Sequence, residues 1–216
     1  MKISPTLTEV KEIAKTGKYD IVPVSCEILS DFITPIEAMR ILQNVSTHCY
    51  LLESAQANEA WGRYTFLGYD PKLEINCIDG HMKLGKLSVE TENPSEYIRQ
   101  ILSEYKSPKF DYLPSFTGGL VGYFSYDYLG YKEKSIRGKA RDTEDFKDVD
   151  LMLFDKVIAF DNLCQKIILI ANMSLDAPET GYNKAIVELK QLRELLMHGE
   201  KKQNMGGKLL GEVTPL

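Results

Sequence analysis

LLES at residues 51–54, followed closely by WGRYTFLGYDP at residues 61–71, is the stretch that decides how this chain folds. It predicts two short β-strands joined by a small polar loop, because apolar, β-branched and aromatic residues dominate both segments. The first strand would end on Glu53 and Ser54, and the second would begin near the guanidinium of Arg63. Opposite charges beside apolar walls suit a small zwitterionic molecule, whose charged ends need partners once desolvated. A hairpin with merely solvated polar ends gives the same pattern.

The residues around this loop suggest individual roles. In a strand, Leu52 and Ser54 share one face while Leu51 and Glu53 share the other. Leu52 can form an apolar wall for a ring, and Ser54 allows close approach and one hydrogen bond. Glu53 could accept a hydrogen bond from an ammonium group or from Arg63, and Arg63 could offer its planar fork to a carboxylate. The residues alone leave open whether Glu53 and Arg63 contact a ligand or each other.

Length and charge narrow the possible functions. The chain has 216 residues, a formal net charge of −5 and no basic stripe, which argues against nucleic-acid binding. The N-terminal twenty residues contain no apolar signal-peptide core. The longest apolar run, residues 167–171, is too short to span a bilayer. These features predict a soluble cytoplasmic protein that binds neither nucleic acid nor membrane, and its four cysteines (Cys26, Cys49, Cys77 and Cys164) are expected to be buried free thiols.

The pattern along the chain predicts its fold class. Helical spacing or cap chemistry indicates four helices, beginning near Leu7, at Thr34, at Asn93 and near Tyr182. Strands outnumber helices and come as hairpins, which predicts an α+β fold with antiparallel β-sheets packed face to face and flanking helices. Two further segments are expected to be a glycine-bearing strand with a close backbone approach at residues 118–126 and a mobile loop at residues 131–148. Tyr123, Tyr126 and Asp127 are interpreted as core and hairpin residues.

Catalytic and metal-binding patterns are weak. No glycine-rich loop opens a helix in the manner of a phosphate site, and His48, His81 and His198 lack metal-ligand spacing. The acidic residues between 142 and 148 are typical of a solvated loop. We therefore predict no catalytic residue and no metal site within this chain.

Three ordered blocks carry a family resemblance. The first is LLES with RYTFLGYDP, the second is PSFTGGLVGYFSYD at residues 114–127, and the third is DLMLFD at residues 150–155 with its continuation to Asp161. Over roughly residues 20–165 the chain resembles the N-terminal half of anthranilate synthase component I and its close relative, aminodeoxychorismate synthase component I. The resemblance implies two antiparallel sheets packed around an amino-acid site. It also implies that Leu52, Glu53, Ser54 and Arg63 bind L-tryptophan.

The resemblance further implies two domains with separate functions. Residues 1–199 would be an N-terminal regulatory domain, and residues 200–216 a linker toward a C-terminal chorismate-binding catalytic domain that this chain lacks. The full-length protein would convert chorismate and ammonia to anthranilate and pyruvate, the first step of tryptophan biosynthesis, under feedback inhibition by L-tryptophan. Mg²⁺ would be bound outside this chain, and a glutamine amidotransferase subunit (component II) would supply ammonia. The fragment alone would be inactive. The alternatives are the aminodeoxychorismate enzyme of folate synthesis and a stand-alone amino-acid-binding regulatory domain.

Overall fold

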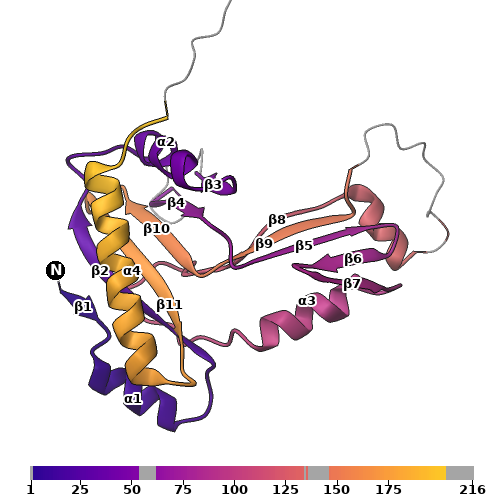
Figure 1. The fold of residues 1–216 in the computed structure, drawn as a ribbon, viewed down its shortest axis with the longest axis horizontal. Coiled ribbons are helices and arrows are strands. Elements are labelled where there is room, and N and C mark those ends of the chain that lie inside the picture. The colour runs from indigo at the N-terminus through magenta and orange to yellow at the C-terminus, as the bar shows by residue number, and fades with distance from the viewer. Residues whose placement is uncertain (1, 54–61, 134, 136–145, 203–216) are drawn as a thin grey trace, which may run out of the picture.

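Two antiparallel sheets and four α-helices make up the part of the chain that the computed structural model describes, residues 2–53, 62–133, 135 and 146–202 (Figure 1). The first sheet has six strands in the order β1 (Ile3–Ser4), β2 (Ile21–Leu29), β11 (Lys166–Ser174), β10 (Lys156–Asp161), β4 (Tyr64–Tyr69) and β3 (Cys49–Leu52). The second has five strands in the order β7 (Leu87–Glu90), β6 (His81–Leu84), β5 (Leu73–Ile78), β9 (Val149–Phe154) and β8 (Gly119–Phe124).

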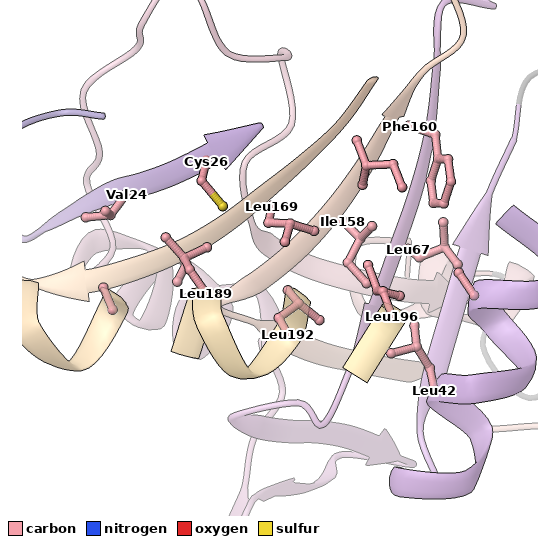
Figure 2. Packing of buried hydrophobic residues seen from close by; sticks show 14 of the residues in the cluster. Val24, Cys26, Leu42, Leu67, Ile158, Phe160, Leu169, Leu189, Leu192 and Leu196 are labelled. Atoms are coloured by element: carbon pink, nitrogen blue, oxygen red, sulfur yellow. The ribbon is translucent and has the colours of Figure 1, made fainter. Parts of the chain in front are cut away.

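Three helices pack on one face of the first sheet, namely α1 (Leu7–Lys15), α2 (Pro35–Val45) and α4 (Pro178–His198). Figure 2 shows the core between them, where the side chains of α4 meet those of β11, β10 and β4. Leu189 and Leu192 are at most 1% exposed there. The opposite face of this sheet has a smaller cluster built on Val157, Ala159, Ile168 and Ile170.

The second sheet has a core of its own. Helix α3 (Pro94–Ser103) contributes Ile98 to a cluster with Ile75, Cys77, Met82, Val149 and Leu151. A short 3-10 helix, η1 (Tyr126–Tyr131), adds Tyr128 and Tyr131 to the same cluster. The predicted α+β fold of antiparallel sheets with flanking helices is therefore confirmed. Aromatic rings join the two sheets, since Tyr50 of β3 contacts Phe154 of β9 with ring centroids 4.7 Å apart.

The predicted helix starts near Leu7, at Thr34 and at Asn93 are confirmed, whereas α4 begins at Pro178, four residues before Tyr182. Thr34 and Glu37 form the capping box at the N-terminus of α2, satisfying backbone N–H groups that the first turn leaves unpaired. At α3 the side chain of Asn93 makes no cap hydrogen bond, and its amide donates to the carboxylate of Glu96 instead.

The glycine-bearing strand behaves as predicted at its backbone but not at its aromatic residues. Gly122 has φ of 151°, and a Cβ there would lie 2.0 Å from the carbonyl oxygen of Asp150, so the expected close approach exists. The assignment of Tyr123, Tyr126 and Asp127 to the core is wrong. Tyr123 is 39% exposed on β8, an outer strand of its sheet. Tyr126 and Asp127 begin the 3-10 helix η1 after that strand, where Tyr126 is 85% exposed and Asp127 is also exposed. Most of the predicted mobile loop lies outside the described residues.

The cysteines are only partly buried as predicted. None of the four cysteines forms a disulfide, and Cys26 and Cys77 are buried as expected. Cys49 is only half-buried, and Cys164 is exposed because it lies in the turn between β10 and β11 rather than in a strand. Across the described ranges, none of the helices has the length and apolarity needed to traverse a bilayer.

Candidate functional site

The end of β3 presents the residues that the sequence placed in a ligand site. Leu52 is the last residue of β3, lies opposite Phe66 of β4 and is 47% exposed. Glu53 follows it directly and is exposed. Ser54 and Trp61, with the loop between them, lie outside the described residues. The strand thus delivers an accessible apolar side chain and a carboxylate at an outer edge of the first sheet.

Arg63 forms an ion pair across the sheet with Asp161, the last residue of β10. Its Nε donates to Oδ1 at 3.1 Å and its Nη2 donates to Oδ2 at 2.6 Å, a two-point contact that fixes the guanidinium plane. The guanidinium also lies 4.9 Å from the ring centroid of Tyr64. The sequence left open a ligand or Glu53 as the partner of Arg63. The structure provides Asp161, a residue quoted only as part of a family block.

The carboxylate of Asp161 is a buried charge. Its side chain is 4% exposed, whereas that of Arg63 is 35% exposed. Besides Arg63, its Oδ1 accepts hydrogen bonds from the backbone N–H groups of Leu163 and Cys164, at 3.2 and 3.1 Å. Burial opposes the charged form, but the hydrogen bonds from Arg63 and from Cys164 outweigh it, so the pKa of Asp161 lies below its ordinary value.

This lowered pKa makes a pH-dependent contribution to stability. The contribution is complete above the pKa of an unfolded aspartate, about 3.9, and is lost as the pH falls through the lower folded-state pKa. We expect the difference in free energy of unfolding between the natural chain and Asp161→Asn to be constant near neutral pH and to shrink below about pH 4. Urea unfolding at several pH values measures it, with Asp111→Asn, an exposed loop aspartate, as control. A difference that stays constant down to pH 2 would contradict the assignment.

Tyr50 carries a buried hydroxyl without a partner in the described residues, a feature that sequence reasoning did not single out. Its ring lies across β4 at Gly68, where a Cβ would come within 2.2 Å of the ring, and it makes edge contacts with Phe116 and Phe154. Its hydroxyl oxygen is buried, and no residue in the described ranges forms a hydrogen bond with it. Burial also raises the pKa of Tyr50, which keeps the hydroxyl protonated. Alternation along β3 was the available signal, because Tyr50 shares a strand face with Leu52.

Register shows how far apart the candidates lie. Leu52 pairs with Phe66, which follows Arg63 by three residues, so Leu52 and Arg63 are separated by about 10 Å along the sheet. Tyr50 and Leu52 stand on one face of β3, while Leu51 packs against the helix-covered core on the other. Within the described residues, no group of three or more His, Cys, Asp or Glu side chains could hold a metal ion.

A hollow of about 490 Å³ lies away from these residues, between α4 and the connections that enter β5 and β10. Of its three lysines, Lys156 pairs with Asp70 at 2.9 Å and Lys184 with Glu188 at 3.8 Å. The third, Lys72, has its Nζ 5.4 Å from the ring centroid of Tyr105.

Comparison with known proteins gives a consistent result. The chain is 34% identical over 198 residues to anthranilate synthase component 1 of Acetivibrio thermocellus, covering 89% of this chain and 39% of that protein. It is 36% identical over 196 residues to anthranilate synthase component 1 of Pseudomonas aeruginosa, covering 87% and 39%. The crystal structure of anthranilate synthase component I from Streptococcus pneumoniae matches with a TM-score of 0.50 and 25% identity, over 77% of this chain and 36% of that one. No protein-family model matches the chain.

Proposed function

We propose that this chain, which is homologous to part of anthranilate synthase component 1, is the N-terminal regulatory portion of such an enzyme. One observation carries the proposal: the similarity extends over 87–89% of this chain but over only 39% of those two relatives. In this proposal residues 1–199 form the regulatory domain and residues 200–216 lead toward a catalytic domain beyond this chain.

The proposed activity belongs to the whole protein. It would make anthranilate and pyruvate from chorismate and ammonia in the cytoplasm, with Mg²⁺ bound by residues outside this chain. A glutamine amidotransferase subunit would deliver the ammonia. Curated relatives from bacteria and from a plant carry the anthranilate synthase name, which supports this activity.

The proposed role of the described residues is to bind L-tryptophan. Leu52 would pack against the indole, and the exposed carboxylate of Glu53 would accept from the ammonium group, with Ser54 beside it. The two N–H groups of Arg63 Nη1 take no part in the bonds to Asp161, so they remain able to donate to the ligand carboxylate.

Feedback inhibition in this proposal works through linkage between two sites. Tryptophan bound at β3 would favour an arrangement of the protein that binds chorismate poorly. A coupling free energy of about 1–3 kcal/mol, typical of such effects, requires that tryptophan bind the two arrangements with different affinities.

An activity assay tests the proposal. We expect the protein encoded by the reading frame continuing past Leu216 to form anthranilate from chorismate, ammonia and Mg²⁺, and tryptophan to inhibit it. The 216-residue chain should show no turnover above buffer background, because no catalytic residue or metal site is predicted within it. Anthranilate fluorescence gives the rates. Turnover by the 216-residue chain, or aminodeoxychorismate as the product of the longer protein, would contradict the proposal.

A further inference from the structure

The segment that follows helix α4 is attached to helix α2, which lies beside the C-terminal end of α4 (Figure 1). Three contacts hold residues 200–202, each joining one of them to α2. They are the hydrogen bond from the Asn44 side-chain amide to the Glu200 carbonyl, the ion pair of Lys201 with Glu37, and the hydrogen bond from the Lys202 N–H to the Arg40 carbonyl at 3.1 Å. We call these three contacts the α2 clasp.

The side chains of the clasp lie on one stripe of α2. Glu37, Ile41 and Asn44 are spaced by four and three residues, so they share a face of the helix. Gly199 passes this face so closely that a Cβ on it would lie 2.5 Å from Cγ2 of Ile41. Ile41 is 2% exposed and belongs, with Leu42, to the core cluster of the first sheet. Helix α2 therefore contacts both the core and the segment that follows α4.

Helix α2 leads into the ligand strand β3 through a short and well-fixed connection. Only residues 46–48 separate the two elements. The hydroxyl of Ser46 donates to the carbonyl of His48 at 2.8 Å and accepts from the backbone N–H of Asp70, just after β4, at 3.0 Å. Leu51 of β3 belongs to the same core cluster as the inner face of α2. Because protein interiors are close-packed, a displacement of β3 has to be accommodated by α2.

We propose that the α2 clasp couples the ligand site at the end of β3 to the polypeptide that follows residue 202. This inference rests on the proposed function, because it concerns how bound tryptophan lowers the affinity for chorismate. Two sites are coupled when both bias the same structural element. Here that element is α2, which a ligand on Leu52 and Glu53 biases through β3, and which the rest of the protein biases through residues 200–202.

The dissociation constant of tryptophan, measured with and without chorismate, tests this coupling. Calorimetry on the full-length protein gives both constants when ammonia is withheld, since turnover then stops. Linkage requires tryptophan to bind less tightly with saturating chorismate than without it. In the variant that combines Asn44→Ala with Lys201→Met, the ratio of the two constants should fall by about threefold or more. Damage to the site itself would instead raise both constants and preserve their ratio.

The two substitutions are chosen to release the clasp without unfolding the protein. Lys201→Met removes the ion pair while leaving Glu37 in its capping box, and the Lys201 side chain is 51% exposed, so the pair contributes little stability. The helix propensity of alanine offsets the hydrogen bond that Asn44→Ala removes. The melting temperature should therefore stay unchanged. Gln43→Ala with Lys190→Met, at exposed positions of α2 and α4 outside the clasp, is the matched control and should keep the natural ratio.

The outcomes separate the clasp from the proposed function. If the natural full-length protein bound tryptophan equally well with and without chorismate, the proposed regulation would fail and the clasp proposal with it. If the natural protein gave two different constants and the clasp variant kept their ratio, the clasp proposal alone would be overturned. An equal fall of the ratio in the control variant would also overturn it, because the effect would then not depend on residues 200–202.

Discussion

Replacement of Arg63 by alanine is expected to lower the free energy of unfolding of the 216-residue chain by about 2–4 kcal/mol. The change leaves the carboxylate of Asp161, 4% exposed, without its cationic partner. Removal of one partner from a fully buried ion pair costs about 3–5 kcal/mol, and the 35% exposure of Arg63 places this pair at the lower end. Urea unfolding at pH 7 measures the loss.

Replacement of the other partner, Asp161→Asn, should lower the free energy of unfolding by less than Arg63→Ala does. The guanidinium that it leaves behind is 35% exposed, so water can solvate it. The asparagine amide oxygen can still accept hydrogen bonds from the backbone N–H groups of Leu163 and Cys164. Arg63→Lys retains the positive charge but loses the two-point geometry, so it should lie between the natural chain and Arg63→Ala. A double-variant cycle then isolates the pair. If the free energy of unfolding of Arg63→Ala equalled that of the natural chain within experimental error, the ion pair would have no structural role.

The ion pair with Asp161 also affects how Arg63 would bind a ligand. A guanidinium fixed by Asp161 presents its Nη1 edge in a defined direction, which lowers the entropic cost of binding a carboxylate. Arg63→Ala would remove both the ligand contact and part of the fold. Tryptophan inhibition in the full-length protein is therefore better compared between Arg63→Lys and the natural residue, at a temperature where both are folded.

The elements of this fold could be predicted from the sequence because their signals are local. Thr34 and Glu37 lie three residues apart, and Asp79 with Gly80 sits at the turn of the β5–β6 hairpin. The pairing of Arg63 with Asp161 could not be predicted in this way, since the two residues are 98 positions apart and meet only through the register of β4 with β10.

The wrong predictions of burial have a common cause. Tyr123 and Tyr126 occur among apolar and aromatic neighbours, and Cys164 stands three residues before the apolar run at residues 167–171, so these patterns favoured burial. Their exposure depends on which strand is outermost and where a turn falls, and these are properties of the assembled sheets. Tyr50 was overlooked for the opposite reason: its environment comes from Gly68, Phe116 and Phe154, all distant in sequence.

Replacement of Ser54 by phenylalanine in the full-length protein is expected to raise the inhibition constant for tryptophan by about tenfold or more, with chorismate turnover largely retained. Ser54 lies outside the described residues, but it follows Leu52 and Glu53 directly, and both of these are accessible at the end of β3. A larger side chain there would collide with the ligand in the proposed site. Loss of one hydrogen bond costs about 1 kcal/mol and the clash adds to it, which together reach the 1.4 kcal/mol of a tenfold change.

The control for this variant is Ser88→Phe, which adds the same bulk at an exposed position of β7 in the second sheet. It should leave inhibition, turnover and melting temperature as they are. If Ser54 were instead a packed strand end, Ser54→Phe would lower turnover and melting temperature together. Unchanged inhibition in a folded and active Ser54→Phe protein would remove Ser54 from the site, and the exposed Leu52, Glu53 and Nη1 edge of Arg63 would then have to bind tryptophan without it.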